Sequence, residues 1–391
     1  MASNTSNTFQ PERDGPFYRS ITHFKVAFNW PRSDDPVIRR RHQIYGATLK
    51  VISLFNFVGI VIHMIFSVKE HHYELLIEGL ALGSGYLGAM ISMTLFVSTE
   101  RTWSNFLRRL LDFKKFGVPP TLNKIVKRFN FLSNVTYIYS YCGTSLYCFI
   151  EITDTAECER VNREEGRTEI CGTVAPIYWP YGLTSTQKII INVIQVVAIM
   201  MYSPQCGIFI CFPSEAIEIL NTRVKHASQL FLELFDNPDE DLEHLKKRMT
   251  FYIEYHIELL SLAEEFNNAF SSLRPCSAGG ALVIAFILTQ LLNTYNLGAI
   301  THVAGWIIGI FLLCRAGQIL QDSLGAIGEA AYFSKWYELN NASIKRTIQL
   351  LILRGQKPTY LEAMPVGNHD FDFFARLSKT SYTYLTVMNQ A

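Results

Sequence analysis

The sequence predicts an all-α membrane protein that crosses the bilayer seven times. The chain is 49% hydrophobic and 18% charged, and its mean hydropathy is +0.13. Several uncharged runs are long enough for a membrane-spanning helix, which takes about 20 residues. Helices buried in a globular protein could explain any one run, but five such runs together favour a membrane protein. The uncharged runs cover residues 51–68, 79–99, 129–150, 189–214 and 275–314. A weaker run over residues 371–391 carries Arg376 and Lys379, so it cannot face lipid along its whole length.

The predicted elements divide the chain into four parts. Residues 1–43 form a polar N-terminal segment whose start lacks the apolar stretch of a secretory signal, so the first span should direct its own insertion. Residues 44–325 hold six spans, because the fifth run is long enough for two spans with a turn near residues 296–298. Residues 326–358 form a cytosolic anchor helix, and residues 359–391 form a loop and the seventh span.

Loop charges predict the orientation in the membrane. Lys and Arg dominate the N-terminal segment and the loop between the second and third spans, whereas the next loop is acidic. Cytosolic loops carry the excess of Lys and Arg, so the N-terminus is expected in the cytosol and the C-terminus outside. That orientation is opposite to a G-protein-coupled receptor. The net charge of +1 argues against nucleic acid as a partner.

The fourth span is expected to continue beyond the membrane. Past Pro213 the amphipathic pattern persists, residues 237–239 give an Asn-Pro-Asp turn signal, and helical periodicity resumes over residues 242–273. These segments predict a cytosolic helical hairpin. Residues 326–354 predict another amphipathic helix, ended by Gly355 and Pro358. Its polar face mixes both signs of charge, so we expect it to pack on the hairpin rather than lie on lipid.

Cysteine positions give one structural expectation. Cys158 and Cys171 share the acidic outer loop and could form a disulfide, with two free thiols as the alternative. The other six cysteines lie in or beside apolar spans, as small buried hydrophobes do. No spacing indicates a metal site, and no motif indicates a cofactor or a catalytic centre. The sequence therefore favours binding and conduction over catalysis.

The last predicted span has the character of a pore-lining helix. Its hydroxyl and amide side chains, including Thr383, Thr386 and Gln390, alternate with apolar ones. A helix with one polar side at membrane depth should face water on that side. The helix carries no acidic residue beyond Asp372, so selectivity among monovalent cations should be poor. The alternative is a last helix buried within a single-chain bundle.

A ligand site is expected in the outer half of the bundle. Aromatic walls with a few hydroxyl or amide groups suit a small, mostly apolar molecule. Such residues fall at helical spacing in the third and sixth spans, and the second and fourth spans add others; each could instead be ordinary core. The candidates are Tyr86, Tyr141, Ser145, Phe149, Ile191, Gln195, His302 and Trp306. Tyr178 and Trp179 in the outer loop could roof this site.

The last sixty residues carry a distinctive series of aromatic, basic and hydroxyl residues. They are Tyr332, Ser334, Trp336, Tyr337, Leu339, Arg354, Gln356, Lys357, Pro358, Leu361, Ala363, Ser381, Tyr382, Tyr384 and Thr386. This series resembles the C-terminal signature of insect odorant receptors. Length, span count and inverted topology agree over the rest of the chain, with less specificity. The coreceptor of that family has a large insertion before the fifth span, which this chain lacks, so the chain resembles an odour-tuning subunit.

The resemblance implies a function and partners. In the family, four subunits surround a pore lined by the last helix, cytosolic helices anchor the subunits, and odorant binds the outer half of the tuning subunit. The implied protein is a non-selective cation channel in the plasma membrane of a sensory-neuron dendrite. It would form a heterotetramer with coreceptor subunits, contact membrane lipid and respond to a small apolar volatile. The alternative is a seven-helix G-protein-coupled or gustatory-type chemoreceptor.

The resemblance also assigns roles to residues at the end of the chain. Aligning the last helix with that of the coreceptor places a hydrophobic gate on Val387 and a polar constriction on Gln390. Thr383 and Thr386 belong to the same pore-lining helix. The anchor helix is expected to hold subunits together through three aromatic residues. These are Tyr332, Trp336 and Tyr337.

Overall fold

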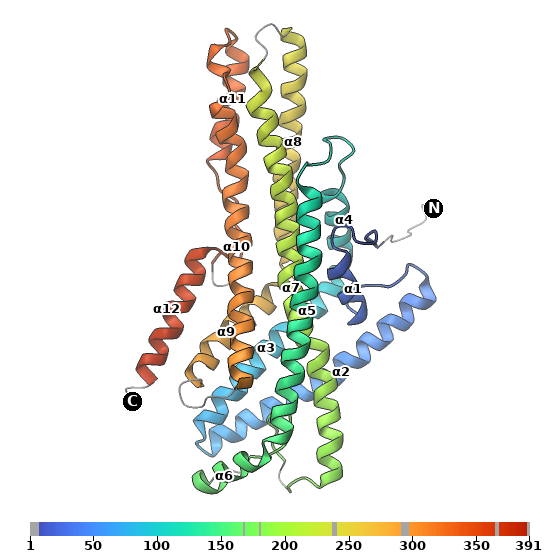
Figure 1. Cartoon of the computed structure of the whole chain (residues 1–391), viewed down its shortest axis with the longest axis vertical. Helices are drawn as coiled ribbons and strands as arrows, with labels where there is room; N and C mark the ends of the chain where they lie inside the picture. The colour runs from blue at the N-terminus through green and yellow to red at the C-terminus, as the bar shows by residue number, and fades with distance from the viewer. Residues whose placement is uncertain are drawn as a thin grey trace.

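The computed structural model describes residues 8–166, 169–179, 181–236, 241–290, 297–363 and 367–388. Within these ranges every regular element is a helix, and the one β feature is an isolated bridge between Glu362 and Asn368. The helices form an elongated bundle that narrows to a rod at one end (Figure 1). The all-α prediction is confirmed.

Seven long helices coincide with the predicted spans. Length and composition alone qualify four described helices as membrane spans, and a pair bent by 62° adds a fifth. The helices over the third and seventh predicted spans do not qualify, because Ser, Thr, Tyr and charged residues lower their hydropathy. The seven-span count therefore stays a prediction. The helices are α2 (Pro36–Lys69), α3 (Tyr73–Ser98), α5 (Leu122–Thr153), α7 (Ser185–Leu232), α9 (Arg274–Gln290), α10 (Leu297–Phe333) and α12 (Phe371–Met388).

Five other helices complete the described part of the bundle. They are α1 (Tyr18–Val26), α4 (Glu100–Leu110), α6 (Thr155–Glu165), α8 (Leu242–Phe270) and α11 (Ala342–Gly355), with single 3₁₀ turns η1 (Glu233–Phe235) and η2 (Trp336–Glu338). The sequence pattern did not predict α1, which packs into the core with Phe17 and Phe24 fully buried. The backbone N–H of Phe17 donates to Glu215 Oε1 in α7 at 2.7 Å. The N-terminal segment is thus part of the core.

The rod begins with α7, which runs unbroken for 48 residues through Pro204 and Pro213. Its start is fixed by a capping box in which Thr184 and Gln187 satisfy each other's backbone N–H groups. A helix of that length spans about 72 Å, more than twice the ~30 Å of hydrocarbon in a bilayer. Its second half runs beside α8, as the predicted hairpin requires (Figure 1). The turn expected at residues 237–239 lies outside the described residues.

Residues 326–354 do not form the single helix that their periodicity predicts. The helix α10 continues to Phe333, the chain then reverses, and α11 packs back against α10. The reason is a new helix start at Asn341, whose side chain accepts from the N–H of Ile344 at 3.1 Å. The two helices touch closely, since a Cβ on Gly328 would lie 2.9 Å from Cα of Gly355.

The chain between α11 and α12 is fastened to the joint between α8 and α9. Asn267 Nδ2 donates to the carbonyl of Tyr360 at 2.7 Å, and Arg274 pairs with Glu362 at 2.8 Å. His369 is buried beside Ser277, with Nε2 and Oγ 3.2 Å apart. Burial, with the charge of Arg274, lowers the pKa of His369 to about 3. We call these contacts the linker clasp.

Candidate ligand-binding cavity

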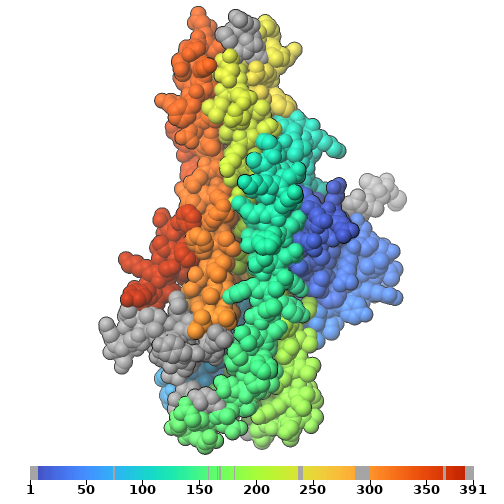
Figure 2. All heavy atoms as spheres, in the orientation of Figure 1, coloured from blue at the N-terminus to red at the C-terminus, as the bar shows by residue number. Residues whose placement is uncertain are grey.

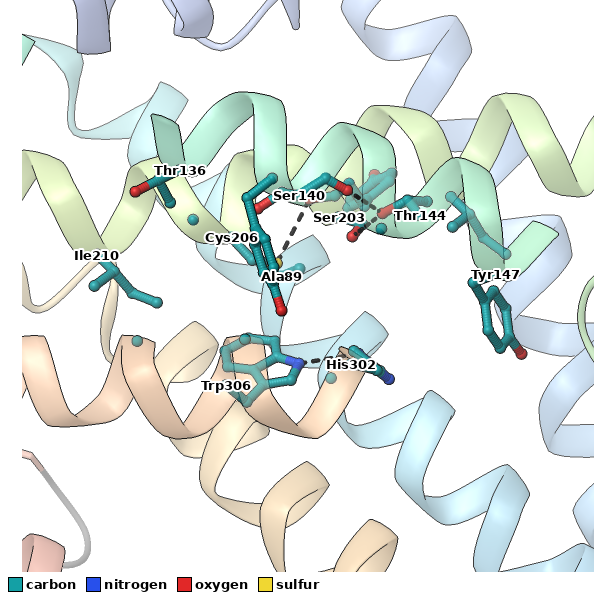
Figure 3. A pocket seen from close by; sticks show the side chains of 18 of the residues that line it. Ala89, Thr136, Ser140, Thr144, Tyr147, Ser203, Cys206, Ile210, His302 and Trp306 are labelled. Carbon is teal, nitrogen blue, oxygen red and sulfur yellow. Dashed lines mark hydrogen bonds between the residues drawn. The ribbon is translucent and has the colours of Figure 1, made fainter. Parts of the chain in front are cut away.

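A cavity of about 370 Å³ lies in the half of the bundle opposite the rod tip. The helices α2, α3, α5, α7 and α10 line it, and α5 with α7 faces α10 across it (Figure 3). Figure 2 shows α5 and α10 side by side over this region. The volume falls in the ~300–1,000 Å³ range of small-molecule sites.

Small side chains on α5 and α7 leave this space open. Ser140, Gly143 and Thr144 line the cavity from α5, and Ser203 lines it from α7. Gly143 is the most open position, because a Cβ added there would find no atom within 4 Å. A larger side chain at Gly143 would therefore fill the cavity without displacing the helices.

Several hydroxyl groups at the cavity are engaged within the protein. Thr144 Oγ1 lies 2.7 Å from the carbonyl of Ser140, to which it donates, and 2.6 Å from Ser203 Oγ. Because Thr144 has one proton, Ser203 must be the donor in the second bond. Tyr139 donates to the carbonyl of Thr301 in α10 at 2.8 Å. These bonds join α5 to α7 and α10, so the surface left for a ligand there is largely carbon.

Trp306 forms the α10 wall and connects the cavity to α9. Its Nε1 donates to Nε2 of His302 at 3.0 Å, which orients the indole and leaves the proton of a neutral His302 on Nδ1 (Figure 3). A Cβ on Gly280 of α9 would lie 2.1 Å from the indole ring, so the ring lies directly on the α9 backbone. A ligand that moves Trp306 would therefore press on α9.

Asn56 of α2 and Tyr86 of α3 close another side of the cavity. The Tyr86 ring lies 5.0 Å from the ring of Tyr202 in α7, measured between centroids. Asn56 is only 4% exposed. Elsewhere in the described part of the chain, no three His, Cys, Asp or Glu side chains come together as a metal site would require.

The loop that follows α6 covers the outer end of the cavity. Gln195 of α7 accepts from the N–H of Ala175 at 3.1 Å and donates to the same residue's carbonyl at 3.0 Å. Asn192 accepts from Val174 at 3.2 Å and donates to Gly172 at 2.9 Å. Ala175 itself lines the cavity. Two amides one turn apart thus fasten the loop to α7.

A disulfide joins α6 to the same loop. Cys158 and Cys171 are bonded, with their Cα atoms 5.6 Å apart. The two aromatic residues expected to roof the site lie elsewhere. Tyr178 stacks on Phe66 of α2 with ring centroids 3.5 Å apart, and Trp179 is 44% exposed. Ala175 occupies the roof position instead.

The structure brings three of the eight sequence-predicted ligand residues to the cavity. Tyr86, His302 and Trp306 line it. Tyr141 and Phe149 are 44% and 65% exposed on the outer surface of α5. An aromatic stripe that faces lipid has the same spacing as one that faces a pocket, so the sequence pattern favoured the face of α5 that points away from the cavity.

Three further candidates also lie away from the cavity. Ser145 is exposed beside Tyr141, whose carbonyl accepts its proton at 2.8 Å. Ile191 lies too far out along α7, whose lining residues begin at Ile199. The side-chain amide of Gln195 is hydrogen-bonded to the backbone of Ala175 in the loop, and Gln195 does not line the cavity. The signal that could have found the correct α5 face is the small polar series Thr136, Ser140 and Thr144, spaced by four residues.

The helix α12 packs against α9 and α10. Its first turn contacts α10 through aromatic rings, with centroids of Phe374 and Phe311 5.4 Å apart. Thr383 is exposed, and its Oγ1 donates to the carbonyl of Lys379 at 2.9 Å. The side chains of Thr386 and Val387, and the whole of Gln390, lie outside the described part of the chain. The gate and the constriction therefore stay predictions.

The three predicted assembly residues lie near the rod tip. Tyr332 and Tyr337 are 58% and 60% exposed, and Trp336 is half-buried with its Nε1 3.3 Å from the carbonyl of Tyr332. Leu350 and Leu353 of α11 are also exposed. We call these five residues the rod-tip surface. An exposed apolar surface of this kind is typical of a protein contact.

Sequence and structure comparisons agree on one family. Residues 72–382 match the sequence profile described as "7tm Odorant receptor". Odorant receptor 67c of Drosophila melanogaster is 26% identical over 45% of this chain and 47% of its own length. Odorant receptor 10 of Aedes albopictus is 26% identical over 56% and 64%. The chain thus spans about half the length of the curated relatives it matches.

A solved structure shows the same fold. It is the insect olfactory receptor OR5 from Machilis hrabei in complex with eugenol, with a TM-score of 0.72 and 15% identity. The superposition covers 95% of this chain and 97% of that one. The same receptor without that ligand matches equally, at a TM-score of 0.72 over 95% and 96%.

Proposed function

Because the chain belongs to the 7tm odorant receptor family, a family of insect membrane receptors rather than enzymes, we propose that it is the odorant-binding subunit of a ligand-gated cation channel. The observation that carries this proposal is the cavity among α2, α3, α5, α7 and α10. A cavity with aromatic walls inside a membrane bundle suits a small, mostly apolar molecule. The eugenol complex of the Machilis hrabei receptor, which has the same fold, supports a ligand of that size.

Ligand binding would reach the pore helix through α9. Trp306 lies on the cavity side of α9 against Gly280, and α12 packs against the same helix. The linker clasp fastens the chain that precedes α12 to the start of α9, through Arg274 and Glu362. A shift of the indole on ligand binding would thus displace the element that holds α12 in place.

The pore is proposed to be lined by α12. Thr383, Thr386 and Gln390 would face water, and Val387 would close the pore by dewetting when no ligand is bound. The described part of α12 has Asp372 as its acidic residue, at the end away from these positions. Hydroxyls and amides would then set a weak selectivity among monovalent cations. Val387→Ser should raise the current without odorant, whereas changes at Gln390 should shift the reversal potential.

The assembly is proposed to be a heterotetramer with coreceptor subunits in the plasma membrane of a sensory-neuron dendrite. The rod-tip surface, with its exposed Tyr332 and Tyr337, supports a contact between subunits on the cytosolic side. The disulfide-bonded loop lies at the opposite end of the bundle, in keeping with an extracellular location (Figure 1). The N-terminus would then be cytosolic.

The test is a whole-cell recording against a panel of volatiles, in cells that express the chain with and without the coreceptor. We expect at least one volatile to evoke a cation current that requires both proteins and persists when G-protein signalling is blocked. Asn4 and Asn341, which begin glycosylation sequons on the proposed cytosolic side, should carry no glycan. A response abolished by the G-protein block, or glycan at Asn4, would support a G-protein-coupled chemoreceptor instead.

A further inference from the structure

Two residues of the cavity wall carry buried polar atoms without a hydrogen-bond partner. Among the lining residues that the structure describes, these are Asn56, through both Oδ1 and Nδ2, and Tyr86, through its hydroxyl. Ser53, one turn before Asn56 on α2, is fully buried and its hydroxyl is also unpartnered. Ser53 and Asn56 approach the Tyr86 hydroxyl as its potential hydrogen-bonding partners, but none of these contacts reaches full hydrogen-bond geometry. We call these three residues the polar corner.

The polar corner contrasts with the other polar groups of the cavity. Thr144 and Ser203 bond each other, Tyr139 bonds a carbonyl of α10, and Trp306 bonds His302. Buried polar groups in proteins nearly always have partners, because an unpartnered one keeps the cost of its lost hydration. Asn56 and Tyr86 both line the cavity, so a ligand group that reaches their polar atoms would supply the missing partner.

We propose that the polar corner binds a hydroxyl group of the ligand, so that the preferred ligands are alcohols or phenols with an apolar body. This inference rests on the proposed function and names the ligand class for the same cavity. A hydroxyl donates one hydrogen bond and accepts others. It would donate to Asn56 Oδ1 while accepting from Asn56 Nδ2 or from the Tyr86 hydroxyl.

Other functional groups satisfy fewer of these atoms. A carbonyl group accepts from Asn56 Nδ2 or Tyr86 but leaves Asn56 Oδ1 without a donor. A hydrocarbon leaves all of the atoms unpartnered. The rest of the wall, including Ala89, Ile210 and Trp306, offers carbon surface to the ligand's body (Figure 3). The expected order of potency on one carbon skeleton is alcohol, then carbonyl compound, then hydrocarbon.

The experiment uses three compounds with one skeleton: an alcohol, the corresponding aldehyde or ketone, and the hydrocarbon. Concentration–response curves are recorded for the full chain with its coreceptor. Wild type should respond to the alcohol at a concentration about tenfold or more below that for the hydrocarbon. Tyr86→Phe and Asn56→Leu should each remove most of this difference by weakening the alcohol alone. Tyr141→Phe, which loses a hydroxyl from the outer surface of α5, should change nothing.

A second readout separates this inference from the proposed function. The thermal unfolding midpoint of the purified receptor is measured with the same three compounds. A midpoint raised most by the alcohol in wild type, and no longer raised by it in Tyr86→Phe, supports the polar corner even if no current flows. Equal potency of the hydrocarbon and the alcohol in wild type would overturn the inference. Currents evoked by both compounds would in that case still support the proposed receptor function. Equal loss for all three compounds in both variants would overturn the inference too.

Discussion

The two halves of α7 lie in opposite environments. Along residues 211–220 every side chain is buried, and aromatic rings surround the helix, with Phe212 centred 4.9 Å from Trp103 and 5.4 Å from Phe24. One to three turns earlier, the same helix presents Ser203 and Gly207 to a cavity. We call the first region the inner half and the second the outer half.

The difference shows how one bundle can be both stable and responsive. The side chains of the inner half are buried, and in a close-packed protein interior the loss of even one methylene group lowers stability. The outer half leaves space that small residues create and a ligand can occupy. Since α5, α7 and α10 pass through both regions, the inner half can hold these helices in register while their outer segments adjust. Substitutions of similar size should therefore have unlike effects in the two halves.

The largest effect is expected from Trp103→Ala in the inner half. Trp103 is fully buried, and its Nε1 donates to Ser272 Oγ at 3.1 Å. Removing a buried aromatic side chain typically costs about 3–5 kcal/mol of folding free energy. Little folded receptor should reach the cell surface, as measured by surface labelling and by size-exclusion chromatography. A wild-type yield from Trp103→Ala would show that the inner half is not the stabilising region.

Two glycine substitutions compare a close helix contact with the open cavity. Gly88 of α3 meets α9 so closely that a Cβ would lie 2.4 Å from the carbonyl of Pro275, whereas Gly143 has open space. Gly88→Ala should destabilise the receptor by about 1–3 kcal/mol through overpacking. Gly143→Ala should be neutral or slightly stabilising, because alanine favours helix by up to ~1 kcal/mol over glycine. Thermal midpoints of the two purified variants, compared with wild type, test this contrast; equal losses would refute it.

The folding stability of the receptor should also depend on pH. Burial, with the charge of Arg354, lowers the pKa of His256 to about 4, and His369 is shifted in the same direction. In the unfolded chain these two histidines therefore bind protons near the ordinary histidine pKa, whereas in the folded chain they stay neutral down to a lower pH. Folding stability should be full above about pH 6.5 and should fall by up to ~1.4 kcal/mol per pH unit for each histidine as the pH drops toward 4.

Replacing His256 with Gln isolates its share of this pH dependence. The thermal midpoint is measured at pH 7.5, 6.5 and 5.5 for wild type and His256→Gln. The variant should lose less stability than wild type between pH 6.5 and 5.5. Identical slopes would mean that His256 does not stay neutral in the folded receptor.

The smallest effect on folding is expected at the rod tip. Trp336 is only half-buried, so Trp336→Ala should leave the thermal midpoint of the isolated subunit nearly unchanged. Its proposed role lies in assembly, so the amount of coreceptor that co-purifies should fall. Trp179→Ala, at an exposed tryptophan of the outer loop, is the matched control and should not affect co-purification. Full co-purification of Trp336→Ala would remove this residue from the interface.

Sequence patterns predicted the long helices well because apolar run length and loop charge are local properties. They missed α1, whose position depends on Glu215, a residue 198 positions away from its partner Phe17. They also predicted one helix over residues 326–354, because helical periodicity continues across the chain reversal before Asn341. A helical repeat in the sequence does not show that α11 turns back and packs against α10.

The cavity was predictable in its helices but not in its faces. Tyr86, His302 and Trp306 line the cavity, whereas Tyr141 and Phe149 face outward. In a membrane, an apolar residue gains as much from facing lipid as from facing a neighbouring helix, so hydrophobicity does not identify the inner side. Small polar residues at helical spacing, which allow helices to approach and leave space between them, are the better indicator.

The most direct test of the account is to fill the cavity and record the response to an activating volatile. In Gly143→Leu the added side chain would occupy the open space beside Thr144. Tyr141→Leu, on the outer face of the same helix, is the matched control. With surface expression equal, we expect the half-maximal concentration to rise about tenfold or more in Gly143→Leu and to stay at the wild-type value in Tyr141→Leu. An unchanged response of Gly143→Leu would contradict the assignment of this cavity as the odorant site.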